Sequence, residues 1–397
     1  AEGISAVILR NYGLTYDRKI PDLAHKFLSG ELTDTSELTA LAKAQVGDAF
    51  TNLTAFSETY IDAIGRSYNG AFAIAGASMV ISMIIFIALR RLYRHADVSE
   101  KQKAARAGLE DQIVELTPAQ TRERLVALFL VFFVVIFFWA AFHQNGFTMT
   151  IFARDYTVDS VSRLHYTWFD LRSFLPLLAA IGGLVLLVRR ASSGAMRGLG
   201  AGLALSGGGI AWWVVSGFAD TMPITPQIFQ HFNPIFIVFL TPIVIGVFTS
   251  LRAKGREPSA PRKIGIGMVL AGLGFGVLMV ASLGLESPAE LEGGVSDTLI
   301  SPYWLVGSYF TLTIAELFLS PMGISFVSKV APPKFKGLMQ GGWFAATAVG
   351  NLLAGAFGLV WGSLAMWQSF MVLVVCCLLA AVFIFSVLGR LERAASA

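Results

Sequence analysis

Long apolar stretches alternate with short polar connections along most of this 397-residue sequence. A helix needs roughly 20 mostly apolar residues to cross a bilayer, and nine stretches reach or approach that length. They cover residues 71–89, 125–151, 173–188, 199–218, 234–251, 264–285, 303–327, 338–360 and 367–388. The pattern therefore predicts nine transmembrane helices in an all-α integral membrane protein.

The composition supports this class, because 55% of the residues are hydrophobic and only 14% are charged. Both cysteines, Cys376 and Cys377, are adjacent in the last predicted span, so they cannot join distant segments. The sequence contains neither a Cys/His cluster with zinc spacing nor a glycine-rich phosphate-binding loop. We therefore expect no metal and no bound cofactor.

Basic residues gather in every second connection between the predicted spans. They are Arg90, Arg91, Arg94, Lys101, Lys103, Arg122, Arg124, Arg189, Arg190, Arg197, Arg252, Lys254, Arg256, Arg262, Lys263, Lys329, Lys334, Lys336, Arg390 and Arg393. The positive-inside rule places these connections in the cytoplasm. The sequence thus predicts a multi-pass protein of the cell (inner) membrane with a cytoplasmic C-terminus. Membrane orientation accounts for the basic residues, so no nucleic-acid partner is expected.

The same pattern divides the chain into segments. Residues 1–69 are expected to form an extracytoplasmic segment with a helix over 36–64, and residues 70–94 a transmembrane helix. Residues 95–121 form a charged cytoplasmic linker, expected to be helical over 98–116, and residues 391–397 a cytoplasmic tail. An extracytoplasmic segment without a membrane signal before it is hard to deliver. We therefore expect the natural N-terminus, with earlier spans, to be missing from this chain.

A carboxylate stands inside one of the apolar spans. Glu316 lies four residues before Ser320-Pro321, and a charge at bilayer depth costs on the order of 3 kcal/mol. Pro321 cannot donate a backbone hydrogen bond, so the helix is expected to kink close to the carboxylate. Broken helices at mid-membrane are typical of transporter substrate sites. The alternative is a buried carboxylate bonded to a hydroxyl, for instance that of Ser320.

Polar and aromatic residues form helical stripes on other spans. Trp139, His143, Gly146 and Thr150 recur at steps of four, three and four, and a second stripe with similar helical steps contains Trp343. Asn233 before Pro234 is expected to be the N-cap of a helix. A membrane histidine can simply bond a neighbouring backbone group, and a tryptophan can simply pack against lipid.

Four segments together resemble the proton-dependent oligopeptide transporters of the major facilitator superfamily. They are Phe138-Trp139-Ala140-Ala141-Phe142-His143-Gln144, Asn233-Pro234-Ile235-Phe236, Glu316-Leu317-Phe318-Leu319-Ser320-Pro321-Met322-Gly323, and Gly341-Gly342-Trp343-Phe344 with Gly350-Asn351. The order matches the sixth helix and the C-terminal six-helix half of that family. Residues 122–390 would then form the C-terminal bundle, with residues 173–218 as an inserted helical hairpin outside it.

The resemblance implies a proton-coupled symporter that imports di- and tripeptides by alternating access, and not an enzyme. Its partners would be small peptides, protons and membrane lipid, and the proton gradient would take the place of a cofactor. The substrate-binding residues would be Trp139, Gln144, Asn233, Glu316, Ser320 and Trp343, and the proton-coupling residues His143 and Glu316. His143, Asn233, Glu316 and Trp343 are expected to converge on one cavity at mid-membrane depth.

The chain departs from the family pattern in three places. The family's first-helix motif is absent, His143 stands where the family has a glutamate, and the hairpin pair occupies a different connection. The first departure bears on autonomous transport and the second on the proton carrier. The alternatives are therefore a transporter of another solute, such as a nitrate-like anion or a drug, a membrane enzyme with His143 as base, and a non-transporting subunit. The enzyme is disfavoured because no nucleophile, metal set or second base stands out beside His143.

Overall fold

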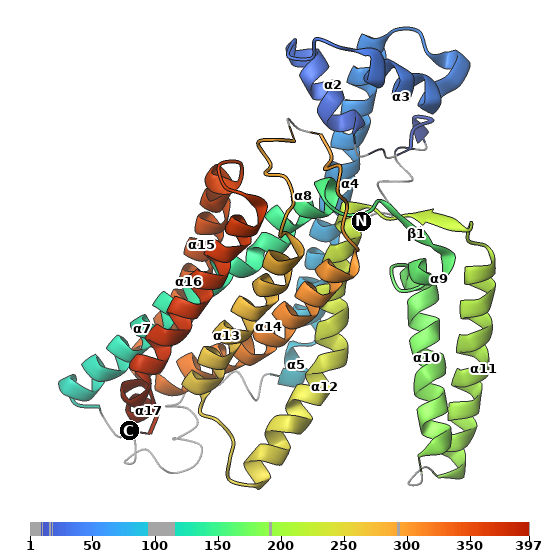
Figure 1. The fold of residues 1–397 in the computed structure, drawn as a ribbon. Helices are drawn as coiled ribbons and strands as arrows, with labels where there is room; N and C mark the ends of the chain where they lie inside the picture. The colour runs from blue at the N-terminus through green and yellow to red at the C-terminus, as the bar shows by residue number, and fades with distance from the viewer. Residues whose placement is uncertain are drawn as a thin grey trace. The chain divides into compact units, whose positions relative to one another are not determined.

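The computed structural model describes residues 9, 11–15, 17, 19–93, 116–189, 193–291 and 294–396. Within these ranges, nine helices are long and apolar enough to cross a membrane. The predicted all-α integral membrane class is therefore confirmed (Figure 1). The chain divides into two units, residues 1–130, 326–343 and 389–397, and residues 131–325 and 344–388.

The first unit contains a small helical core near the N-terminus. Helices α2 (Ile20–Ser29), α3 (Ser36–Val46) and the beginning of α4 (Leu53–Ala88) enclose a cluster of buried apolar side chains. The Tyr60 hydroxyl lies in this cluster, donates to the Thr15 carbonyl oxygen at 3.0 Å and accepts from the Asp17 amide at 2.8 Å. These two bonds satisfy a buried phenol and tie the preceding segment to α4.

The expectation of one helix over residues 36–64 is wrong. The 3₁₀ turn η1 (Gly47–Ala49) interrupts it, and Gly47 has a φ of 54°, a conformation that side chains disfavour. Asn52 then caps α4, because its side chain accepts a hydrogen bond from the Ala55 amide at 2.7 Å. From this cap α4 continues without interruption through the first predicted span.

The remaining helices of the first unit come before and after most of the linker, residues 95–121, along the chain. Helix α5 (Arg90–Tyr93) follows α4, and α7 begins at Pro118, ahead of the predicted span. The helix expected over 98–116 lies almost wholly outside the described residues. The tail expected over 391–397 is part of a helix, α17 (Leu388–Ser396).

The spans predicted beyond residue 122 correspond to the following elements. They are α7 (Pro118–Phe142) with η3 (His143–Gly146) and α8 (Thr148–Asp155), α10 (Leu171–Val188), α11 (Gly194–Ser216), α12 (Phe232–Ala253), α13 (Ala260–Ala281), α14 (Tyr303–Val330), α15 (Lys336–Trp361) and α16 (Met366–Ser386). Two short 3₁₀ helices, η4 (Pro226–His231) and η5 (Pro333–Phe335), precede α12 and α15. Helix α14 runs unbroken through Pro321, so the Ser-Pro pair does not end the helix.

Helices α10 and α11 pack side by side as a hairpin (Figure 1). A Cβ atom on Gly183 would lie 2.5 Å from the Gly200 carbonyl oxygen, and one on Gly207 would lie 2.5 Å from that of Pro176. These glycines therefore let the two backbones approach closely, as small residues do in membrane helix pairs. The strands β1 (Ser160–Ser162) and β2 (Thr221–Pro223) flank the hairpin and pair antiparallel, which brings its entry and exit together.

A cluster of charged side chains closes the connection between α12 and α13. Arg252 donates to both oxygens of Glu257, at 2.5 and 3.0 Å, and Lys263 donates to the same carboxylate at 2.6 Å. The Lys263 ammonium also lies 3.9 Å from the centre of the Phe248 ring. The bonds from Arg252 and Lys263 lower the pKa of Glu257 to about 2. The carboxylate thus neutralises a lysine that is only 3% exposed.

We expect Glu257→Gln to destabilise the protein, because it leaves buried Lys263 without its counter-charge. Thermal unfolding in detergent at pH 7 measures the loss. The lowered pKa means that the carboxylate's contribution is present above its unfolded pKa near 4.5 and is lost as the pH falls towards 2. The difference between wild type and variant should shrink over that interval. Glu286→Gln, at an exposed loop position, is the control; equal melting temperatures for wild type and Glu257→Gln would contradict the prediction.

Candidate functional site

The predicted span over residues 125–151 is interrupted in its C-terminal part. Helix α7 ends at Phe142, the four residues His143–Gly146 form the 3₁₀ turn η3, and α8 begins at Thr148. The expectation of one polar and aromatic stripe along a continuous helix is therefore wrong beyond His143. Trp139 and His143 remain one turn apart, but Gly146 and Thr150 do not continue that helix face.

His143 stacks on Trp139 at this break. The two ring centres are 5.0 Å apart with an interplanar angle of 22°, and His143 Nδ1 lies 3.1 Å from the Trp139 carbonyl oxygen. The backbone bond that is the simple alternative for a membrane histidine is therefore present. If Nδ1 carries the proton for this bond, Nε2 remains to accept one.

Gln144 holds the break in place. Its fully buried amide donates to the carbonyl oxygens of Ala140 and Ala354, each at 3.1 Å, and its carbonyl accepts from the Thr148 hydroxyl at 2.9 Å. The side chain therefore joins the end of α7, α8 and α15. Its amide hydrogens and its carbonyl oxygen are thus used in hydrogen bonds within the protein.

A polar stripe runs along α14. Tyr309, Thr313, Glu316 and Ser320 follow one another at steps of four, three and four, which places them on one helix face. The Tyr309 hydroxyl donates to the Asn145 carbonyl oxygen in η3 at 2.8 Å. This face of α14 therefore contacts the break beside His143.

Asn233 reaches the same face from α12. Its amide donates to the Glu316 carboxylate at 2.9 Å and to the Thr313 hydroxyl at 3.2 Å. The predicted N-cap role is wrong, because α12 already begins at Phe232 and continues from η4, and His231 occupies the cap position. The side chain is used for a contact between helices instead.

A further hydrogen bond joins η4, which precedes α12, to α8. The Gln230 amide in η4 donates to the Thr150 hydroxyl in α8 at 3.0 Å. Together with the Tyr309–Asn145 and Asn233–Glu316 bonds, it links α8, η3, α14 and α12 through side chains that are far apart in sequence. Three of the segments singled out in the sequence are thus brought together.

Two buried polar atoms of the candidate residues have no hydrogen-bond partner in the structure. Trp139 Nε1 and Ser320 Oγ are both buried without one, so Ser320 does not provide the bond to Glu316 that the sequence suggested. Among the described residues, no basic side chain lies within ion-pair distance of Glu316. Unsatisfied buried groups of this kind call for a ligand or water.

Trp343 belongs to the first unit and lies on α15. Its side chain is 2% exposed, so it is buried in the protein and does not face lipid. Of the four residues expected to converge, Asn233 and Glu316 are joined by a hydrogen bond.

The back of α14 is held by α13. The Ser308 hydroxyl donates to the Gly274 carbonyl oxygen at 2.9 Å, and a Cβ on Gly267 would lie 3.0 Å from the Ala315 carbonyl oxygen. This close packing fixes the rotation of α14 and so the direction of Glu316.

Gly350 of α15 packs directly against Trp139. A Cβ there would lie 2.7 Å from both the Ile136 carbonyl oxygen and Trp139 Cβ. We expect Gly350→Ala to lower the free energy of unfolding by about 1–3 kcal/mol, because the backbones must separate. Gly355→Ala on the same helix is the matched control, since a Cβ at that position would meet no atom within 4 Å. Thermal unfolding compares the two, and a Gly350→Ala protein as stable as Gly355→Ala would contradict the contact.

Tyr309 and Thr313 do not stand out in the sequence as part of the site. Their spacing to Glu316 is visible there, but hydroxyl-bearing residues are common in membrane helices. Asn145 and Gln230 give no signal at all, and Thr150 stands out only as a member of the expected stripe, not as a partner of Gln230. Their roles arise from contacts 80 and 164 residues apart along the chain.

Part of the chain is similar to known transporters. Residues 214–360 match the family model described as POT family. The peptide transporter YePEPT of Yersinia enterocolitica is 30% identical over 237 residues, which cover 60% of this chain and 34% of that protein. Dipeptide and tripeptide permease B of Xenorhabdus bovienii is 37% identical over 131 residues, or 33% of this chain and 25% of the permease.

A crystal structure of the peptide transporter POT in complex with sulfate overlaps 91% of this chain and 65% of its own, at 19% identity and a TM-score of 0.48. The chain matches about a third or less of the length of the two curated relatives. The family match agrees with the resemblance seen in the motifs, because residues 214–360, the segment that matches the POT family model, contain Asn233, Glu316 and Trp343.

Proposed function

We propose that this chain is the C-terminal portion of a proton-coupled symporter that imports di- and tripeptides by alternating access. The observation that carries the proposal is Glu316, a carboxylate inside a span whose described partner is the neutral Asn233 amide. A half-buried carboxylate with an amide partner but no cation is suited to receive an ammonium group. The amino terminus of a peptide supplies that group.

The surrounding residues take complementary roles in this proposal. Asn233 and Thr313 orient the Glu316 carboxylate, and the unsatisfied Ser320 hydroxyl and Trp139 indole are available to the peptide backbone. Trp343 keeps the substrate-binding role that the family resemblance implies. Gln144 acts indirectly, by holding the break that presents His143.

His143 and Glu316 are the proposed proton-coupling groups. Imidazole is the side chain whose charge changes most readily near neutral pH, and His143 lies at a helix break connected to α14 through Tyr309. A proton on His143 would add a positive charge close to the face that carries Glu316. Coupling then requires His143 and Glu316 to change their protonation states during the transport cycle.

The proposed orientation places the basic connections in the cytoplasm, in the inner membrane, with the C-terminus also inside. Another small solute on the same fold is the second candidate. The names of the similar proteins favour peptides, because they are a peptide transporter and a dipeptide and tripeptide permease.

Uptake of alanyl-alanine by the full-length protein in proteoliposomes tests the proposal. With an acidic outside and neutral inside, the dipeptide should accumulate above its external concentration, and an ionophore that collapses the proton gradient should abolish the accumulation. Uptake that equilibrates without responding to the gradient would contradict symport. Uptake of nitrate in place of dipeptide would identify the other solute class.

A further inference from the structure

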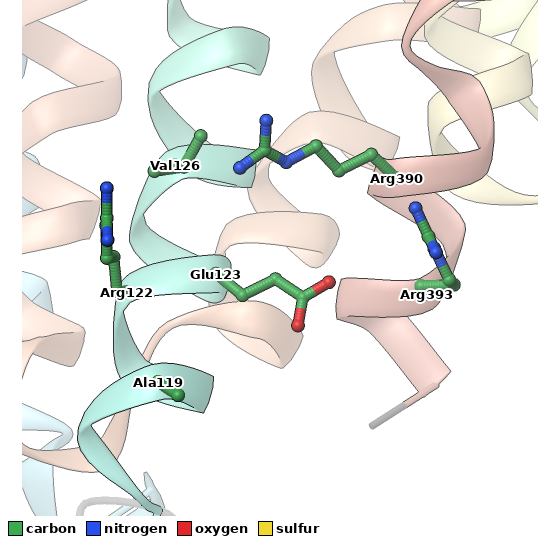
Figure 2. A pocket seen from close by; sticks show the side chains of 6 residues that line it. All are labelled: Ala119, Arg122, Glu123, Val126, Arg390 and Arg393. Atoms are coloured by element: carbon green, nitrogen blue, oxygen red, sulfur yellow. The ribbon is translucent and has the colours of Figure 1, made fainter.

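A cavity of about 590 Å³ lies between the start of α7 and the C-terminal helix α17 (Figure 2). Its lining residues are Ala119, Arg122, Glu123, Val126, Arg390 and Arg393. All six belong to the first unit. The cavity therefore shares no residue with the Asn233–Glu316 contact, which belongs to the second unit.

Three guanidinium groups against one carboxylate make this cavity basic. Figure 2 shows the Arg390 guanidinium directed towards α7 and the Glu123 carboxylate directed towards α17. Among the described residues, neither Arg122 nor Arg390 forms an ion pair. Guanidinium groups bind phosphate oxygens through paired N–H donors, so the lining suits a phosphate-bearing ligand.

The position of the cavity indicates where that phosphate comes from. Arg122 and Glu123 lie within the first two turns of the α7 span, and Arg390 follows the end of the α16 span by four residues. Both sets of residues therefore lie at the end of an apolar span, the depth at which phospholipid headgroups are found. A cavity of this volume is within the range of small-molecule sites.

Helix α17 is amphipathic, with a buried apolar face and exposed arginines. Leu391 and Ala394 are buried, at 0% and 2% exposed, whereas Arg390 and Arg393 are exposed one turn apart. The apolar face of α17 is thus packed on protein, and the two arginines point away from that face. The two α17 arginines are thus presented where an anionic headgroup would approach.

We propose that this basic cavity binds the phosphate of an anionic phospholipid of the leaflet that faces the basic connections. Arg390 and Arg393 hold the phosphate, Arg122 adds positive charge to the lining, and Glu123 limits the affinity by like-charge repulsion. The site is distinct from peptide binding and does not depend on the proposed transport activity. A basic pocket of this kind fits the general chemistry of headgroup recognition.

Titration of the purified, delipidated protein with dioctanoyl-phosphatidylglycerol, followed by calorimetry, tests the proposal. The double variant Arg390→Gln/Arg393→Gln should weaken binding at least about tenfold, and Glu123→Gln should strengthen it. Arg91→Gln, which removes an exposed arginine from α5, should leave binding unchanged. Dioctanoylglycerol, which has the same tails but no phosphate, should not bind at this site.

Three further results would overturn the proposal. Inorganic phosphate that bound as tightly as the lipid would show a free-phosphate site instead of a lipid site. If Glu123 serves as the ion-pair partner of the α17 arginines, Glu123→Gln would lower the melting temperature as much as the arginine variants do and would not improve lipid binding. Should the double variant fail to fold, Arg390→Lys, which keeps the charge but loses the planar fork, should still weaken binding, and unchanged binding by that variant would refute the site.

Discussion

Replacing Glu316 with glutamine is expected to abolish uptake of dipeptides while leaving the protein folded. The Asn233 amide can still bond the side-chain oxygen of a glutamine, so the α12–α14 contact survives. The negative charge proposed to receive the peptide ammonium is lost. Loss of a buried charge partner costs about 2–5 kcal/mol, which corresponds to a roughly 30-fold or larger fall in affinity.

The discriminating measurement compares two substrates in the same proteoliposomes. Wild type should prefer alanyl-alanine to N-acetyl-alanyl-alanine, which lacks the ammonium group, and Glu316→Gln should lose that preference. Glu286→Gln makes the same chemical change at an exposed loop position and serves as the control. A Glu316→Gln transporter that still favoured the free amine would disprove the ammonium contact.

Replacing His143 with glutamine is expected to uncouple transport from the proton gradient. Glutamine can keep a hydrogen bond to the Trp139 carbonyl oxygen but stays neutral at every physiological pH. Accumulation driven by an acidic outside should therefore disappear. Exchange of labelled for unlabelled dipeptide at equal concentrations and equal pH should continue, because it requires no net proton movement.

The pH profile of uptake separates a proton role from a structural one. Wild-type uptake should depend on pH near neutrality, and the His143→Gln profile should be flat there. His25→Gln, at an exposed position in the N-terminal helical core, is the control for loss of a histidine. If His143→Gln retained the wild-type pH dependence, His143 would be a neutral hydrogen-bonding residue.

Both predictions depend on contacts that helix periodicity alone does not reveal. Glu316 is identifiable from the sequence because a carboxylate in an apolar span is costly wherever the helix packs. Its partner is not, since Asn233 before Pro234 is equally typical of a helix start. Only the packing of α12 on α14 brings Asn233 to Glu316, 83 residues away.

The sequence by itself determined the membrane class and the nine spans found among the described residues, because burying about 20 apolar residues in a bilayer needs no tertiary partner. Its motifs also pointed to the family whose model matches residues 214–360. The tertiary structure decided the break at His143, the internal bonding of Gln144, and the contact of Tyr309 with η3. It also placed Arg390 and Arg393 beside Glu123 at the start of α7. Hydrophobicity is a property of each segment, whereas a hydrogen bond depends on the relative placement of two segments, and that placement is set by packing.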